Sequence, residues 1–587
     1  MATPVDLSRV TFIVMRDMRR PIMALLLVYA FSILGMTFIP GELDDFGHPR
    51  RMTIFHSFYF MTYTATTTGF GEIPYPFSDA QRGWAIICLY SSVITWIYAI
   101  GAIVQLLQNP FFIYALAEWR FSRKVRQIRI PYFIICGFGD TGSVLARGLS
   151  DYGWACVIID DNEERIKALQ LRNYKVPMLG LYADASVPKH LLEAGLTRKN
   201  CKAIVAITND EEVNLKISTI ARVLNPNLGI ITMSKIEVVE ETLANLGGET
   251  HIVDPFKTFA KVLAASMHNP GFYALNRWLA REKRGRINYH TKPPLGKWVI
   301  CGYGRMGYEV NRVLSHHGIE ATIIDPHGYN GQPVNSYITG RTTSKTLSEA
   351  KIEQAVGILA GTNDDGHNLA IILNARRFNP TLFTIARQNH HQNDIAFTAT
   401  DTDMVMQPTL VTARKILFLL IAPLLKPFFF YLLEDKVGRA DEMEQVIERL
   451  RMIIGDKTPY LTTINFTEDS TESVYKWLMN GDDVFLGGLL KHPDNRERLL
   501  ELVVFVIKSG NEIIVLPKDD YKIKLGDQLL FCGTKRSQSL FNAITNNDYK
   551  LFYTQKGVFL PRGKLGKKIL DLGKKFEGTE QDKKNKA

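Results

Sequence analysis

The sequence has few cysteines and none of the spacings that build a disulfide framework or a zinc site. Six cysteines are scattered over 587 residues, with no C-x-x-C pair and no histidine nearby at ligand spacing. That distribution argues against both kinds of site and is typical of thiols in a reducing cytosol. Cys136 and Cys301 stand inside apolar, strand-like runs, where a free cysteine is usually a small core side chain.

Three further patterns are missing. No basic stripe is interleaved with aromatic residues, because the net charge of +11 comes from lysine and arginine beside hydrophobic spans and in a polar tail. We therefore expect no nucleic-acid partner. No arginine-rich sensor helix is present, which argues against voltage sensing. The first apolar run is not followed by an A-x-A-like cleavage site, so we expect no signal peptide.

What the sequence does contain is a limited membrane part. Residues 21–39 are uncharged and long enough to cross a hydrocarbon core of about 30 Å as a helix. Residues 83–117 are also uncharged, and we predict a second spanning helix at about 84–108 with a break at Pro110. The rest of the chain is too long for one core and should form several domains.

Charge sets the expected orientation of the two spans. Basic residues precede the first span and follow the second, so both ends should be cytoplasmic by the positive-inside rule. These residues are Arg9, Arg16, Arg19 and Arg20 on one side and Arg120, Arg123, Lys124, Arg126 and Arg129 on the other.

The segment between the spans reads as a half-length apolar helix followed by small residues with two glycines spaced by one. Irregular backbone at membrane depth is tolerated where it lines a water-filled path or is buried in protein. Glycine permits the left-handed φ that turns successive carbonyl groups toward one axis, where they can replace the hydration shell of an ion. Residues 52–72 therefore predict a re-entrant pore loop.

Within this loop the run TATTTGFGE, residues 64–72, resembles the potassium-channel signature T-x-T-T-V-G-Y-G-D. The resemblance implies K⁺ as the permeant ion. It differs at Thr68, Phe70 and Glu72, and Phe70 lacks a hydroxyl that braces the filter in the family. The implied filter residues are Thr67, Thr68, Gly69, Phe70 and Gly71.

Two similar segments follow, each a predicted strand running into G-x-G-x-x-G and a helix, with a second strand ending in aspartate about twenty residues later. This is the dinucleotide-binding fingerprint, in which the helix N-terminus attracts phosphate and the aspartate accepts hydrogen bonds from ribose. Two Rossmann units that pack but bind nothing remain an alternative. The candidate nucleotide-binding residues are Gly137, Phe138, Gly139, Asp140, Thr141, Gly142, Asp160, Asp161, Asp184 and Asn209 in the first repeat, and Gly302, Tyr303, Gly304, Arg305, Met306, Gly307, Asp325 and Arg341 in the second.

The two loops differ in charge. Asp140 opens the first helix where Arg305 opens the second, and Arg341 in the second repeat adds positive charge near the position of Asp184 in the first. A carboxylate repels extra phosphate charge, whereas a guanidinium binds it. We predict that the first site prefers NAD and the second a nucleotide with exposed phosphates, such as ADP or ATP. Alternatively, Arg305 pairs with an acid across a domain interface.

Carboxylates after the fourth strand of the first repeat form a candidate metal site. Asp210, Glu211 and Glu212 stand where acidic side chains can face a cleft, and Ca²⁺ prefers several oxygen ligands. No EF-hand spacing is present. The alternative, an N-cap of the following helix, is favoured by capping preferences.

One pore unit joined to two such repeats resembles the potassium channels with tandem RCK domains. This resemblance implies a homotetramer with eight RCK domains in a ring, membrane lipid as partner, and a place in the cell inner (plasma) membrane with cytoplasmic RCK domains. The fold class expected is an all-α two-span pore unit with a re-entrant loop, two α/β Rossmann-like RCK domains and a small α+β lobe.

The expected domain boundaries follow from these assignments. They are a pore module at 1–118, a basic linker at 119–130, RCK domains with helical pairs at 131–290 and 291–440, a C-terminal lobe at 441–555 and a basic, disordered tail at 556–587.

Residues 416–433 are almost uncharged, yet Lys426 and two prolines argue against a third span, and we predict a buried helical pair between RCK domains. A membrane-tethered NAD-dependent oxidoreductase and the ligand-sensing subunit of a potassium transporter are the rival functions. The covalently attached pore segment argues against both, and we expect no enzyme.

Overall fold

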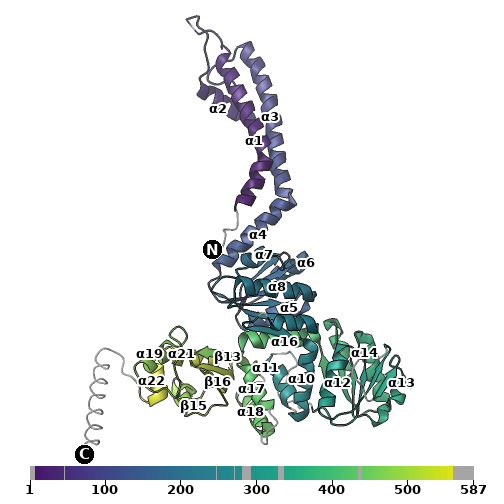
Figure 1. Ribbon diagram of the computed structural model, residues 1–587. Helices are drawn as coiled ribbons and strands as arrows, with labels where there is room; N and C mark the ends of the chain where they lie inside the picture. The colour runs from purple at the N-terminus through teal and green to yellow at the C-terminus, as the bar shows by residue number, and fades with distance from the viewer. Residues whose placement is uncertain are drawn as a thin grey trace, which may run out of the picture. The chain divides into compact units, whose positions relative to one another are not determined.

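The computed structural model describes eight stretches of the chain (Figure 1). By contacts they divide into two compact units. The first holds residues 1–131 with two short segments, Val157–Ile159 and Leu179–Asn200, and the second holds the remainder. The predicted junction at 290–291 and nearly all of the predicted tail lie outside the described residues. The stretches are 7–44, 46–245, 247–269, 271–280, 292–327, 336–433, 439–455 and 457–559.

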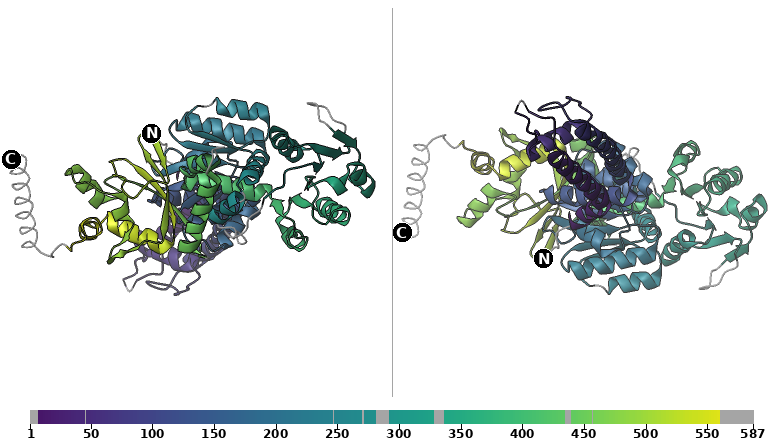
Figure 2. Two further views of the ribbon diagram at one scale, coloured as in Figure 1. Left: turned by 90° about the horizontal axis from the view of Figure 1, so that it is seen from below. Right: turned by 90° about the horizontal axis from the view of Figure 1, so that it is seen from above.

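The first unit opens with the two predicted spans and the short helix between them. Two of its helices are long and apolar enough to cross a membrane. They run side by side, with the short helix against both (Figures 1 and 2). A buried cluster that includes Met36, Phe60 and Cys88 joins all three. The helices are α1 (Leu7–Phe38), α2 (Ile54–Ala65), α3 (Asp79–Gln108) and α4 (Pro110–Gln127).

Local sequence explains where these helices begin and end. Ser78 and Gln81 form a reciprocal capping box at the start of α3. The predicted break at Pro110 is confirmed: α3 ends at Gln108, and the Asn109 side chain accepts a hydrogen bond from Phe111 N at the start of α4. The first helix begins earlier than the predicted span because the arginines before it continue the same helix.

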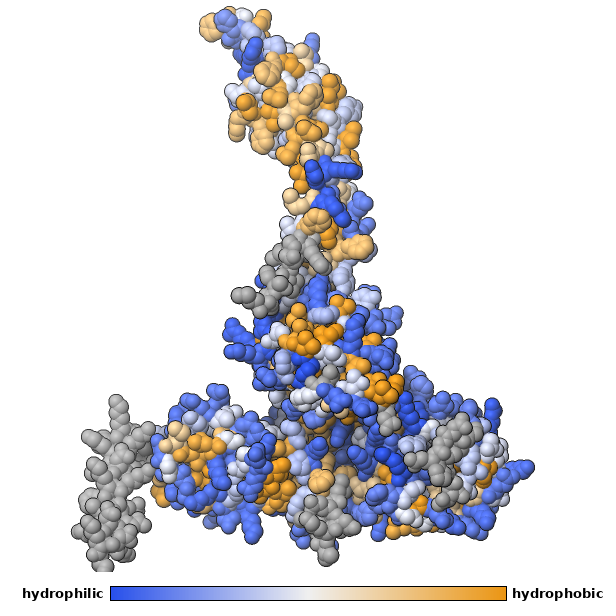
Figure 3. All heavy atoms as spheres, in the orientation of Figure 1, coloured by the Kyte–Doolittle hydropathy of each residue, from blue (hydrophilic) through white to orange (hydrophobic). Residues whose placement is uncertain are grey.

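Large apolar side chains cover the outer surfaces of α1 and α3 (Figure 3). Monomeric soluble proteins rarely expose apolar patches of this extent, so the surface fits lipid or further protein rather than water. Exposed members include Leu26, Leu27, Phe31, Ile94, Ile97 and Leu107.

Two six-stranded parallel sheets follow, and their topology is the same. The first has the order β3-β2-β1-β4-β5-β6, and the second has β9-β8-β7-β10-β11-β12. Both are the doubly wound order in which ligands bind where the strand order reverses, between the first and fourth strands. The internal duplication and the predicted Rossmann folds are therefore confirmed.

The elements of the first Rossmann domain alternate strand and helix. They are β1 (Tyr132–Cys136), α5 (Asp140–Asp151), β2 (Ala155–Asp160), α6 (Glu163–Leu171), β3 (Met178–Tyr182), α7 (Pro188–Glu193), β4 (Cys201–Ala206), α8 (Glu211–Leu224), β5 (Gly229–Met233), α9 (Glu237–Ala244), β6 (Thr250–Val253), α10 (Pro255–His268) and α11 (Gly271–Leu279).

Among the described residues, the second Rossmann domain repeats this pattern with six α-helices instead of seven and with two 3-10 helices, η1 and η2. Its elements are β7 (Trp298–Cys301), α12 (Arg305–His316), β8 (Ala321–Asp325), β9 (Ser336–Thr339), α13 (Ser344–Glu349), η1 (Ile352–Gln354), β10 (Gly357–Ala360), α14 (Asp365–Phe378), β11 (Phe383–Arg387), η2 (His391–Asn393), α15 (Asp394–Ala399), β12 (Met404–Met406), α16 (Pro408–Ile421) and α17 (Leu425–Leu433).

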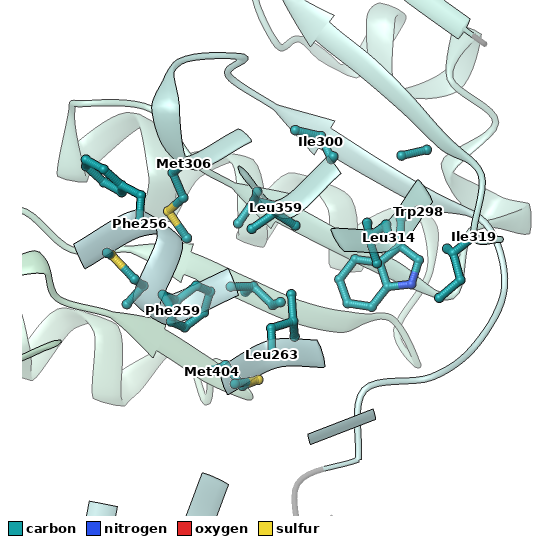
Figure 4. Close-up of a cluster of buried hydrophobic side chains, with 14 of the residues drawn as sticks. Phe256, Phe259, Leu263, Trp298, Ile300, Met306, Leu314, Ile319, Leu359 and Met404 are labelled. Atoms are coloured by element: carbon teal, nitrogen blue, oxygen red, sulfur yellow. The ribbon is translucent and has the colours of Figure 1, made fainter. Parts of the chain in front are cut away.

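Each Rossmann domain contributes a helix to the other. Helix α10 of the first domain buries Phe256, Phe259 and Leu263 in the core around Trp298 of the second (Figure 4). Helix α16 of the second domain runs along α5 of the first. There Leu417 approaches so closely that a Cβ on Gly148 would lie 3.3 Å from it. Burial of apolar surface in both directions joins the domains.

The predicted helical pair at 416–433 is α16 and α17, which meet at a bend of 114°. Leu417 faces α5, and the Phe428 ring stacks on Phe505 of β16 (Leu502–Ser509) with centroids 4.3 Å apart. Helix α16 thus packs against a helix of the first Rossmann domain. Helix α17 packs against the C-terminal lobe and leaves Phe430 71% exposed, so the pair is only partly buried.

The C-terminal lobe is α+β, as predicted. Its antiparallel sheet has the order β13-β18-β16-β17, and helices pack on it around Phe466, Phe531 and Phe541. Its elements are α18 (Arg439–Ile454), β13 (Tyr460–Asn465), α19 (Glu472–Met479), α20 (Leu486–Leu489), β14 (Lys491–His492), β15 (Asn495–Leu499), β16 (Leu502–Ser509), β17 (Glu512–Val515), β18 (Gln528–Gly533), α21 (Lys535–Thr545) and α22 (Asp548–Lys556).

Because all six cysteines are buried and free, an introduced surface cysteine can be labelled selectively. Gln445→Cys, on the exposed face of α18, should resist an impermeant external reagent in intact cells and react after permeabilisation. Phe46→Cys, in the loop between the spans, is the matched control that should react in intact cells. Labelling of Gln445→Cys in intact cells would show that α16 and α17 cross the membrane.

Candidate ion filter and nucleotide sites

The predicted filter has an alternating backbone. Thr67, Gly69 and Gly71 have φ of 58°, 69° and 89°, whereas Thr68 and Phe70 between them are not left-handed. Alternation of left- and right-handed residues turns successive carbonyl groups to the same side of the chain. That is the geometry expected of a strand whose carbonyls coordinate an ion. A left-handed threonine is uncommon and costs free energy, so the surrounding structure must hold it.

Two tyrosines of α2 hold the outer part of this strand. The Tyr63 hydroxyl donates to the Gly71 carbonyl at 2.5 Å. The Phe70 ring lies parallel to Tyr59 with centroids 6.4 Å apart and meets Tyr63 edge to face at 5.5 Å. Phe70, which has no hydroxyl, is thus held by contacts with two aromatic rings. Sequence analysis missed both tyrosines, although their spacing of four places them on one face of the helix.

Glu72 ties the end of the filter to the second span. Its Oε1 lies 2.8 Å from Arg82 Nε and its Oε2 lies 3.2 Å from Arg82 Nη2, which is a bidentate ion pair. The same carboxylate accepts a hydrogen bond from Phe77 N at 2.8 Å. This position, one of the three departures from the signature, thus anchors the filter to α3.

The first glycine loop is a tight turn. Gly137 has φ of 102°, and a Cβ there would lie 2.8 Å from the Ile207 carbonyl. A Cβ on Gly142 would lie 2.2 Å from Gly137 O. Gly139 precedes α5, whose first turn has no side-chain cap. The free N–H groups at this helix start can therefore receive a phosphate.

The second glycine loop has the same construction. Gly302 has φ of 91°, and a Cβ on Gly307 would lie 2.2 Å from Gly302 O. Gly304 precedes α12, again without a side-chain cap, while the Met306 side chain is buried in the core below. Both loops therefore keep the close approach of helix and strand that the fingerprint requires.

The aspartates that end the second strand of each domain hold the glycine loops. Asp160 accepts hydrogen bonds from Phe138 N and, at 2.9 Å, from Asn162 N. Asp325 accepts from Tyr303 N at 2.7 Å and from His327 N at 2.8 Å. Each carboxylate thus lies beside its loop, where the fingerprint places it. The predicted contact with ribose remains a prediction.

Two arginines that sequence analysis overlooked stand beside the first loop. Arg165 Nη1 lies 3.6 Å from Asp160 Oδ2. The Arg172 guanidinium lies 5.5 Å from the centre of the Phe138 ring and donates to Ser143. The first loop therefore carries positive charge, and Asp140 is an exposed residue that does not make the loop acidic as a whole. The predicted charge contrast between the loops is correspondingly weaker.

Arg305 pairs with an acid of the other domain. Its Nη1 lies 3.8 Å from Glu211 Oε1, and its side chain is half exposed. The other oxygen of Glu211 accepts hydrogen bonds from Ser234 Oγ and from two backbone N–H groups. Burial opposes ionisation of Glu211, but these donors and Arg305 outweigh it and lower its pKa. The structure thus contains the ion pair between domains that was the alternative for Arg305.

The candidate metal residues do not converge. Asp210 caps α8 by accepting from Glu212 N at 2.9 Å and from Val213 N at 3.3 Å. Glu211 holds the loop after β5, and Glu212 is exposed. Asp210 is therefore an N-cap residue, as the alternative predicted. The three carboxylates do not come together around one position where a metal ion could bind.

The remaining candidates lie at the surface. Asp184 accepts hydrogen bonds from Ser186 N and Oγ in the turn before α7. Thr141 is half buried at the start of α5, and the others are exposed. These are Asp161, Asn209 and Arg341.

Two asparagines with equivalent roles were also missed. Asn214 accepts from Thr208 N at 2.9 Å and donates to Met233 O at 3.2 Å, which joins the ends of β4 and β5. Asn368 makes the same bonds to Thr362 N and to Arg387 O. The repeated pattern T-N-D-x-x-x-N, at 208–214 and 362–368, was the available signal.

Comparison with known proteins agrees with this organisation. Residues 23–109 match the family model described as "Ion channel". Residues 133–255 and 298–408 each match the model described as "TrkA-N domain". The pore module and both Rossmann domains are therefore matched separately, and in the order the structure has them. The chain belongs to the potassium channels with TrkA-N, or RCK, domains.

Relatives of this channel include "Potassium channel protein 1" of Methanocaldococcus jannaschii, 24% identical over 310 residues that cover 52% of this chain and 79% of the relative. A "Trk system potassium uptake protein TrkA homolog" of Pyrococcus horikoshii is 29% identical over 136 residues, which cover 21% of this chain and 60% of that protein. These similarities are to transport proteins rather than to an enzyme.

Among solved structures, one described as "GsuK channel bound to NAD" is 17% identical to this channel. The alignment covers 91% of this chain and 99% of that one, with a TM-score of 0.46. The NAD belongs to that protein.

Replacing Gly71 by alanine tests the filter backbone. A Cβ there would meet nothing within 4 Å inside the chain, so the cost is the left-handed φ, about 1–2 kcal/mol. We expect loss of K⁺ over Na⁺ selectivity in reconstituted channels. Gly101→Ala, in open space on α3 without positive φ, is the control that should stay selective. Intact selectivity in Gly71→Ala would refute the filter assignment.

Replacing Gly307 by alanine tests the second glycine loop. The new Cβ overlaps the Gly302 carbonyl, so the loop must shift, and we expect a loss of about 1–3 kcal/mol in the free energy of unfolding of this domain. Gly304→Ala has open space around it and should change that free energy by less than about 0.5 kcal/mol. Denaturant titration measures both. Equal stability of the two variants would contradict the described loop.

Proposed function

We propose that four copies of this chain form a K⁺-selective channel in the cell inner (plasma) membrane, opened and closed by nucleotides that bind its cytoplasmic RCK domains. The observation that carries the proposal is the alternating backbone of Thr67, Thr68, Gly69, Phe70 and Gly71, braced by Tyr63. One chain supplies one strand of carbonyl groups, and a coordinating ring needs several copies. Four such strands around an axis replace the hydration shell of K⁺.

The tetramer also explains exposed apolar surface. Phe70 is 58% exposed in one chain although its ring belongs to the filter strand, and the outer faces of α1 and α3 are apolar. Neighbouring subunits and membrane lipid would cover these surfaces. Arginines beside both spans support a cytoplasmic position for the RCK domains, and four chains would bring eight of these domains into a ring.

The two glycine loops are the proposed nucleotide sites. Each offers an uncapped helix N-terminus and an aspartate at the end of the adjacent strand. NAD, ADP and ATP share the phosphates and ribose that such a loop binds. Arg165 and Arg172 bring positive charge to the first loop. The proposed preference of the first site for NAD and of the second for ADP or ATP therefore depends mainly on Arg305. Ca²⁺ is not part of this proposal, because Asp210 and Glu211 already accept backbone hydrogen bonds.

Gating then follows from unequal binding. A nucleotide shifts the channel between closed and open only if it binds the two conformations of the ring with different affinity. Helix α4 follows the second span after one residue, Asn109, and Glu118 of α4 pairs with Lys189 in the first RCK domain. A movement of this domain would therefore pull on α4 and shift the end of α3 that precedes it.

A flux assay with the purified chain in liposomes tests the channel function. Liposomes that contain the chain and are loaded with K⁺ should release K⁺ down its gradient. Liposomes loaded with Na⁺ instead should release little Na⁺. Equal flux of both ions, or none under any nucleotide condition, would contradict the proposal.

Arg305→Ala tests the second nucleotide site. Loss of one charge-assisted contact should weaken ADP binding by about ten-fold or more and leave NAD binding nearly unchanged. Glu211→Gln removes the competing ion pair and should strengthen ADP binding. Arg312→Ala, on the same helix but paired with Glu309, is the control. Calorimetry on the full chain decides: equal ADP affinity in wild type and Arg305→Ala would leave Arg305 as an interface residue only.

A further inference from the structure

Metal-ligating side chains meet at the contact between α4 and α7. Glu118 comes from α4, and His190 and Glu193 come from α7. The ligand atoms of the three side chains lie within 4.8 Å of one another. A spacing of three residues puts His190 and Glu193 on one face of their helix. The cluster therefore joins the helix that follows the pore to the first RCK domain.

The cluster is buried and short of positive charge. The side chains of Glu118 and Glu193 are 7% and 3% exposed. Neither oxygen of Glu193 accepts a hydrogen bond of good geometry, and Lys189 Nζ lies 3.3 Å from Oε1. The same ammonium group also pairs with Glu118. One lysine thus serves two buried carboxylates, which favours a further cation at this place.

The His190 ring is oriented as a metal ligand. Its Nδ1 lies 2.7 Å from the Asp184 carbonyl, which can only accept a hydrogen bond, so Nδ1 carries the proton. Nε2 is then left with a lone pair and lies 3.8 Å from Glu118 Oε1. Metal-binding histidines characteristically donate their other N–H to a carbonyl or carboxylate in this way.

We propose that Glu118, His190 and Glu193 bind one divalent transition-metal ion, with Zn²⁺ as the best match, and that the ion displaces the Lys189 ammonium. Zinc accepts imidazole nitrogen and carboxylate oxygen together and leaves a fourth position for water. Ca²⁺ and Mg²⁺ prefer oxygen alone, so the imidazole selects against them. Lys189 is 40% exposed and can turn into solvent.

A metal ion at this site would regulate the contact between α4, which follows the second span, and α7 of the first RCK domain. A metal ion that holds α4 to α7 makes this contact stiffer than an ion pair with a partly exposed lysine. This effect on current rests on the proposed function, whereas metal binding itself does not. Sequence analysis missed the site because it contains no cysteine and joins residues more than seventy positions apart.

Calorimetry with Zn²⁺ on the purified full chain tests the proposal. All variants are made in a background chain that carries His268→Gln and His317→Gln. These two substitutions remove an exposed pair of imidazoles, with nitrogens 3.4 Å apart, that could also bind zinc. We expect one ion per chain in this background. His190→Gln and Glu193→Gln should each lower the affinity at least about ten-fold. Lys189→Met removes the competing cation and should raise it by about ten-fold.

Lys189→Met separates a metal site from a purely structural ion pair. If the cluster is only an ion pair, this variant gains no zinc affinity, and that result would overturn the proposal. Zinc binding that survives unchanged in His190→Gln and Glu193→Gln would do the same. Thermal unfolding with and without zinc shows whether the variants fold: zinc should raise the unfolding temperature of the background chain and not that of His190→Gln. Flux without added zinc tests conduction separately, so failure of the channel function leaves the zinc result intact.

Discussion

The exchange of helices between the two Rossmann domains is the constraint on which the cytoplasmic part depends. Helix α10 completes the core around Trp298, and α16 covers α5 of the other domain. Neither domain can release its helix without exposing a large apolar surface to water. The exchange also brings Arg305 of one glycine loop to Glu211 of the other domain. A ligand that draws Arg305 away would thus change a contact between the domains as well as its own site.

The filter depends on a different kind of constraint. Its alternating φ values include a left-handed threonine, Thr67, which an isolated peptide would rarely adopt. Tyr63 of α2 donates a hydrogen bond to the Gly71 carbonyl, and Arg82 of α3 pairs with Glu72, so two different helices hold the end of this strand. Tertiary contacts at Phe70, Gly71 and Glu72 therefore hold the backbone of the proposed filter, and its glycines permit the left-handed φ.

Much of this architecture could be predicted from sequence because it depends on local pattern. Hydropathy located the two spans, and the repeated strand, glycine loop and aspartate located both Rossmann domains. The break at Pro110 followed from a residue that starts helices readily. Contacts between distant segments could not be predicted in this way. The exchange of α10 and α16, the Arg305–Glu211 pair and the position of Arg165 beside Asp160 all depend on which surfaces pack together.

The predicted ligand preference of the two nucleotide sites also missed contacts between distant segments. The prediction depended on Asp140 and Arg305 in the loops and on Arg341 after the third strand of the second repeat. Arg172 comes after the next helix, yet its guanidinium lies over the ring of Phe138 in the first loop. Charge at a binding site is a property of everything packed around it, and part of that set is distant in sequence.

The most direct test of the account is a current recording from the purified chain in an excised membrane patch, with NAD or ADP applied to one face at a time. The account predicts that nucleotide on the cytoplasmic face changes the open probability of K⁺-selective openings, that the reversal potential stays the same, and that nucleotide on the outer face has no effect. K⁺-selective openings that ignore nucleotide on both faces, or a response only from the outer face, would contradict it.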